Sequence, residues 1–159
     1  MRRGTAAVSA ATPTPDAPVP QGDYQAARVV GGLVFTAGMT PRADGGLPVV
    51  GVLGADLTAL QAVPLAALAA ARAVEAGRRA AEAAGLRLTS GISMTVYLAA
   101  TPGFTEHSRV ADGASSRLRA LLPGPAPVRA AVGVASLPSG APVEVTLVLA
   151  TEPALSRQP

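Results

Sequence analysis

The segment that most constrains the fold is residues 127–145, where two apolar runs typical of β-strands flank a turn rich in proline and glycine. Each run carries a single charge: Arg129 lies in the first and Glu144 in the second. A charge inside a strand is costly unless it is paired, exposed or used by a site. Arg129 and Glu144 are therefore the first candidates for function.

The spacing of the two charges does not favour a contact within one chain. In a simple hairpin with residues 139–140 at its tip, Glu144 faces Ala135 and Arg129 faces Ala150. The charges are then about six strand positions apart, which is roughly 20 Å. Either the connection is not a simple hairpin, or a site that uses both residues is built from two subunits, and we favour the second. The plain alternative is that both are solvated surface charges.

The rest of the chain alternates strand-like and helix-like segments. Gly31 and Gly32 separate two short β-type runs, which is a strong hairpin signal. The expected elements are two strands (24–30 and 33–39), a helix from 56, a strand (92–99), a helix from 101 or 105 to about 122, and two final strands. This order predicts an α+β domain with both helices on one face of a mixed sheet.

The first expected helix has clear ends and an irregular middle. Residues 56–58 offer an N-cap and Gly85 a C-cap, whereas Pro64 predicts a break or a late start and Gly77 weakens the centre. Alanine dominates the helical pattern between them. A face of such small side chains predicts that this helix approaches the sheet closely.

A chain of 159 residues is long enough for one domain with a substantial core. Residues 1–21 are rich in Ala, Thr and Pro without a period, which predicts a mobile tail. We therefore expect a tail at 1–21, a folded domain at 22–152 and a short C-terminal tail at 153–159.

Absent residue types exclude several chemistries. The chain contains no cysteine, all 13 basic residues are arginines, and His107 is the only histidine. Thiolate catalysis, disulfides, Schiff-base lysines and the P-loop lysine are thereby excluded, and a His-cluster zinc site is not expected. We expect no cofactor and no metal. Catalysis must rely on Arg, Asp, Glu, Tyr, Ser or Thr side chains, backbone groups and water.

Neither a membrane nor a nucleic acid is an expected partner. The most apolar run, residues 62–71, is too short to span a bilayer and contains Pro64. Arg2 and Arg3 are followed by no apolar stretch of the kind an export signal needs, so the expected location is cytoplasmic. The net charge is +3, but the arginines are scattered, and the four aromatic residues are too dispersed to form a base-stacking surface.

The segment 127–145 resembles the C-terminal signature of the Rid family, the YjgF-type reactive intermediate deaminases. Three earlier segments match in the family's order: Gly22-Asp23-Tyr24, residues 33–41, and residues 110–115. The resemblance extends from about residue 20 to 152, and the third of these segments is similar to a longer-chain subgroup.

This resemblance implies a chorismate-mutase-like α+β fold and a homotrimer with clefts between subunits. In deaminating relatives, the arginine matching Arg129 grips a substrate carboxylate, and the glutamate matching Glu144 positions the water that attacks a C=N carbon. Tyr24 matches a pocket tyrosine, while Ala37 and the backbone of Gly38 lie where relatives line the cleft. The implied reaction converts a 2-aminoacrylate or 2-imino acid into a 2-keto acid and ammonia.

These residue types suit that reaction. A guanidinium binds a carboxylate through two parallel charge-assisted hydrogen bonds and so fixes its plane as well as its position. An imine is already electrophilic, so held water and one carboxylate that accepts a proton can suffice.

Four positions depart from the family pattern. Ala37 replaces a small polar residue, Met39 a glutamine, Ala131 a cysteine of some members, and Asp112 a frequent asparagine. Each makes the cleft less polar or changes its charge. Asp112 would repel an anionic substrate if it faced the cleft, although we favour a structural role near the start of its helix. His107 is expected at the surface.

The leading hypothesis is therefore an imine or enamine hydrolase. One alternative is a dedicated biosynthetic enzyme that acts on a larger imine-bearing metabolite in the same cleft. Another is a non-catalytic trimer that binds small carboxylates. A ribonuclease is disfavoured because the sequence offers no basic stacking surface.

Overall fold

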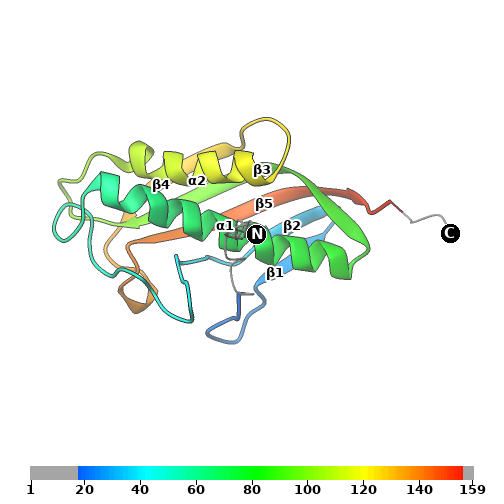
Figure 1. Ribbon diagram of the computed structural model, residues 1–159, viewed down its shortest axis with the longest axis horizontal. Coiled ribbons are helices and arrows are strands. Elements are labelled where there is room, and N and C mark those ends of the chain that lie inside the picture. The colour runs from blue at the N-terminus through cyan, green and yellow to red at the C-terminus, as the bar shows by residue number, and fades with distance from the viewer. Residues whose placement is uncertain (1–17, 156–159) are drawn as a thin grey trace, which may run out of the picture.

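A computed structural model describes residues 18–155 (Figure 1). The elements follow the expected order: β1 (Ala27–Val30), β2 (Leu33–Thr36), α1 (Ala59–Ala83), β3 (Leu86–Ala99), α2 (His107–Leu121), β4 (Val128–Val134), a 3-10 turn (Pro138–Gly140) and β5 (Val143–Pro153). The expected tails at 1–21 and 153–159 fall mostly outside the described residues.

The strands form one mixed sheet in the order β1-β2-β5-β3-β4. Strand β4 runs parallel to β3, and the other neighbours are antiparallel. The last two strands therefore do not form a simple hairpin, because β3 lies between them, so the predicted register was wrong. Strand β3 is the longest strand at 14 residues; β5 pairs with it along most of its length, and β4 pairs with its C-terminal half, from Ser93 to Ala99.

The β1–β2 hairpin confirms its glycine signal. Val30 pairs with Leu33, and the intervening Gly31 and Gly32 have φ angles of 57° and 79°. Two consecutive positive φ angles suit the right-handed twist of the flanking strands, and glycine reaches them without steric cost.

Helix α1 is continuous through Pro64, so the predicted break is wrong. Its N-cap is Thr58, whose side chain accepts a hydrogen bond from the Gln61 backbone while the Gln61 side chain accepts one from Thr58. Pro64 removes the hydrogen bond to the carbonyl of Leu60. Leu60 lies on the exposed side of the helix, where water can bind that carbonyl instead.

Both helices cover the same face of the sheet, as Figure 1 shows and as the sequence predicted. The alanine-rich side of α1 is buried, and a Cβ on Gly77 would lie 2.6 Å from the Leu149 side chain. Gly113 of α2 likewise lies against the Val63 backbone carbonyl. Small residues thus let α1 approach both the sheet and α2 closely.

The strands show which face is covered. Along β5 the buried side chains Val143, Val145, Leu147 and Leu149 alternate with partly exposed ones. Within residues 18–155, α1 alone matches a membrane span in length and hydropathy, yet 61% of its most apolar window is buried in the domain. Packing on the sheet therefore accounts for its apolar character.

Candidate functional site

Arg129 and Glu144 lie on opposite faces of the sheet. Arg129 pairs in register with Met94, which is buried beneath the helices, whereas Glu144 pairs with Tyr97 on the open face. Paired residues share a face and successive residues alternate. Two strand spacings and three residues of β3 separate the α-carbons of Arg129 and Glu144, which gives about 14 Å. One chain therefore cannot bring both side chains to one small substrate.

The guanidinium of Arg129 contacts helix α2. Its Nη1 donates hydrogen bonds to Asp112 Oδ1 at 2.8 Å and to Ser115 Oγ at 2.9 Å. The side chain of Arg129 is 21% exposed and that of Asp112 is 69% exposed. Asp112 therefore acts on the predicted anion-binding residue directly, while Ser115 is a partner that the sequence analysis did not identify as a site residue.

The carboxylate of Glu144 lies over Gly38, where a Cβ would collide with it. Gly38 is held there because the neighbouring Met39 and Val145 exchange two backbone hydrogen bonds of 2.9 Å each. Burial raises the pKa of Glu144 above its ordinary value of 4.5. Two residues that were predicted separately, Glu144 and Gly38, therefore lie together, and the raised pKa of the Glu144 carboxyl group suits proton transfer.

Hydroxyl side chains occupy the open face beside Glu144. Ser93, Thr95 and Tyr97 alternate along β3, and Tyr97 sits directly opposite Glu144. A cavity of about 180 Å³ lies on this face, lined by Phe35, Thr36, Ser93, Thr95, Thr146, Leu147 and Val148. The alternation of residues 92–99 was visible in the sequence. The pairing of β5 with β3, which places Glu144 among these hydroxyl groups, was not.

The other two predicted site residues, Tyr24 and Ala37, make no hydrogen bond to Arg129 or Glu144 within residues 18–155. The side chain of Tyr24 is half exposed, and its hydroxyl accepts a hydrogen bond from the Gln21 backbone. Among residues 18–155, no hydrogen bond joins Tyr24 to Arg129 or Glu144. Ala37 is partly buried, and its backbone donates to Ala26. The roles of Tyr24 and Ala37 stay predictions.

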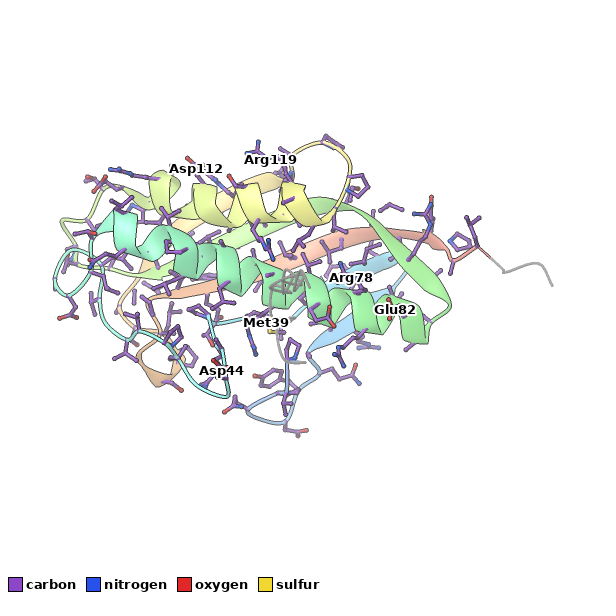
Figure 2. The ribbon with its side chains drawn as sticks, viewed as in Figure 1. Met39, Asp44, Arg78, Glu82, Asp112 and Arg119 are labelled. Carbon is purple, nitrogen blue, oxygen red and sulfur yellow. The ribbon has the colours of Figure 1, made fainter. Side chains whose placement is uncertain are left out.

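Two of the family departures face the helix side. Met39 is only 5% exposed and belongs to the core, beside α1 in Figure 2. It therefore fills the interior and does not line an open cleft. Ala131 pairs with the buried Val96, so it shares the face of Arg129 and lies two residues beyond it on β4.

His107 begins α2 and is partly buried. It contacts the ring of Phe104 edge to face at 5.2 Å between centroids. Both line a cavity of about 550 Å³ at the carboxyl ends of the parallel strands β3 and β4, together with Thr101 and Gly133. Among the described residues, no three His, Asp or Glu side chains are grouped as metal ligands would be.

Comparison with known proteins agrees with this fold. The family model described as Endoribonuclease L-PSP matches residues 14–151. Protein TCP17 of Trypanosoma cruzi is 35% identical over 133 residues, which is 82% of each chain.

Solved structures superpose over most of the chain. A protein of unknown function from Agrobacterium tumefaciens is 28% identical with a TM-score of 0.77, covering 84% of this chain and 86% of its own. RidA from an Antarctic Psychrobacter is 26% identical with a TM-score of 0.55, covering 84% and 93%. By the match across residues 14–151 and the shared fold, this chain belongs to the Endoribonuclease L-PSP family, which includes the YjgF and Rid proteins.

Proposed function

We propose that this protein hydrolyses small imines or enamines of the 2-aminoacrylate or 2-imino acid type to 2-keto acids and ammonia. The observation that carries the proposal is Glu144, a half-buried carboxyl group on an uncovered sheet face whose pKa is raised by burial. Carboxyl groups with a perturbed pKa cluster at functional sites, where burial tunes them for proton transfer. Family membership supports small-molecule chemistry as the context.

The site is composed of two copies of the chain in this proposal. Arg129 on the helix side of edge strand β4 and Glu144 on the open face of β5 are about 14 Å apart on opposite faces. If a neighbouring copy packs its open sheet face against the β4 edge of the first copy, Glu144 of the neighbour and Arg129 of the first copy can line one cleft. We propose a homotrimer with three such clefts, and light scattering should give three times the chain mass of 15.7 kDa.

The chemistry needs no group beyond these side chains and water. Arg129 holds the substrate carboxylate, and Glu144 accepts a proton from water as its oxygen bonds to the C=N carbon. The protonated Glu144 passes this proton to the nitrogen, which gives a carbinolamine with OH and NH2 on the same carbon. Glu144 then accepts the hydroxyl proton and passes it to the nitrogen as the C–N bond breaks, so the oxygen becomes the carbonyl of the 2-keto acid, ammonia leaves and Glu144 is ionised again. A 2-aminoacrylate follows the same steps after tautomerising to the imine, in which C3 gains a proton and the nitrogen loses one. A raised pKa suits both steps, because the carboxyl group must accept and donate near neutral pH.

The test is a coupled assay in which a dehydratase generates 2-aminoacrylate and the release of keto acid is followed. Wild-type protein should accelerate release, and Arg129→Ala should lose about 10- to 100-fold of that acceleration, as expected when charged hydrogen bonds are removed. Arg119→Ala is the matched control, because Arg119 lies exposed on α2 and, among the described side chains, hydrogen-bonds only to Ser116. No acceleration by wild type would refute the proposal, and full activity of Arg129→Ala would refute the role of Arg129.

The two alternative functions receive less support from the geometry. A larger metabolite needs a roomier cleft, but Met39, one of the departures from the family pattern, is buried in the core and widens no cleft. A non-catalytic carboxylate-binding protein needs no carboxyl group with a raised pKa. Binding of 2-ketobutyrate without turnover of its imine would favour this second alternative.

A further inference from the structure

The guanidinium of Arg129 is already held along one side. Its Nη1 carries two hydrogens, and Asp112 Oδ1 and Ser115 Oγ accept one each at 2.8 Å and 2.9 Å. Within residues 18–155, neither Nε nor Nη2 of Arg129 has a hydrogen-bond partner. These two nitrogens form the side-on edge of the guanidinium, whose parallel N–H groups match the two oxygens of a carboxylate.

The contact with Asp112 also lowers the net positive charge around the Arg129 guanidinium. Arg129 and Asp112 form an ion pair at 2.8 Å, so their formal charges cancel. An incoming anion therefore meets a neutral ion pair whose remaining N–H donors, Nε and Nη2 of Arg129, have a fixed direction. It does not meet an isolated positive charge. A second negative group on the ligand placed beside Asp112 would be repelled by its carboxylate, which is 69% exposed and, within residues 18–155, forms an ion pair with Arg129 alone.

We infer that Asp112 and Ser115 are positioning and specificity-determining residues for Arg129. They orient its Nε–Nη2 edge toward the substrate and restrict the site to ligands with a single carboxylate. This inference rests on the proposed role of Arg129 as the carboxylate clamp. Asp112 and Ser115 themselves need not touch the substrate, since both act through Nη1.

Calorimetric titration with 2-ketobutyrate, which has one carboxylate, and 2-ketoglutarate, which has two, tests the charge effect. Asp112→Asn keeps an oxygen that can accept from Nη1 but removes the negative charge. It should tighten 2-ketobutyrate binding about two- to five-fold, the scale of an exposed ion pair, and tighten 2-ketoglutarate binding by a larger factor. The gain should shrink in high salt, because exposed charges are screened.

Two further variants separate charge from orientation. Ser115→Ala removes a hydrogen bond without changing charge, so it should weaken 2-ketobutyrate binding about two- to ten-fold. Glu106→Gln is the matched charge control, since Glu106 lies at the start of the same helix, is similarly exposed and pairs with Arg109. It should leave the preference between the two keto acids unchanged. In turnover assays Asp112→Asn should lower KM and leave kcat unaltered.

The outcomes keep this inference apart from the proposed function. If wild type binds neither keto acid and turns over no imine, the proposed function fails, and gain of binding by Asp112→Asn alone would still support the charge effect. If wild type binds and Asp112→Asn leaves both affinities and their ratio unchanged, the inference is overturned while the function stands. An equal gain from Glu106→Gln would also overturn it, because net charge alone would then explain the result.

Discussion

The two faces of the sheet are built from the same strands but from different side chains. On the covered face, Val145, Leu147 and Leu149 are buried under alanine-rich helices. On the open face, the intervening positions of β5 are Glu144, Thr146 and Val148, which lie beside hydroxyl side chains of β3. The covered face supplies the core of a single chain. The open face contributes little to that core and is therefore available for assembly and chemistry.

The largest expected effect follows from Glu144→Gln on the open face. Loss of a proton acceptor should lower imine turnover about 10²- to 10⁴-fold, the usual contribution of general acid–base catalysis. The melting temperature should not fall, because no core contact is lost. Parallel assays of turnover and thermal unfolding check both statements, and a large drop in melting temperature would place Glu144 with the structural residues.

The adjacent pair Leu149 and Val148 compares the faces directly. Leu149→Ala should lower the free energy of unfolding by about 2–5 kcal/mol, because it leaves a cavity beneath α1. Val148→Ala should cost about 1 kcal/mol or less at a protein concentration low enough to keep the chain monomeric. Urea denaturation with light scattering on the same samples measures this, and equal costs would contradict the distinction between the faces.

A reciprocal swap of neighbours sharpens the contrast. Val145→Thr places a hydroxyl in the covered face and should cost about 1–3 kcal/mol unless it finds a partner. Thr146→Val removes a hydroxyl from the open face and should change the free energy of unfolding by less than about 0.5 kcal/mol. The denaturant midpoints of the two variants and wild type, compared where the dependence of the free energy of unfolding on denaturant is the same, measure both changes. A costly Thr146→Val would show that its hydroxyl is needed for folding.

The smallest expected effect is a pH dependence of stability from Glu144. Because burial raises its pKa above 4.5, the folded state holds this proton to higher pH than the unfolded state. Stability from Glu144 is therefore complete below 4.5 and is lost as the pH rises through the raised pKa. Wild type and Glu144→Gln should unfold alike in acid, while the variant should become the more stable at neutral pH. A difference that is constant with pH would disprove this linkage.

Local signals predicted most of the fold. Gly31 and Gly32 specified a hairpin, and small residues at helical spacing specified a helix close to the sheet, since both depend on neighbours along the chain. The break predicted at Pro64 was wrong, because the destabilisation by a helical proline depends on whether water can bind the carbonyl left without a hydrogen bond. The orientation of the helix decides this, and the sequence alone does not show it. The order of the strands could not be predicted, because strand partners far apart in sequence leave no local mark.

The candidate site divides in the same way. The sequence alone made Arg129 and Glu144 candidates for function, because a lone charge in an apolar strand is costly wherever the strand lies. Tertiary structure alone decided that β3 separates β4 from β5, that the two charges face opposite sides of the sheet, and that Asp112 and Ser115 hold Arg129. The physical reason is that charge and apolarity belong to single residues, whereas face, register and hydrogen-bond partners arise only when distant segments pack together.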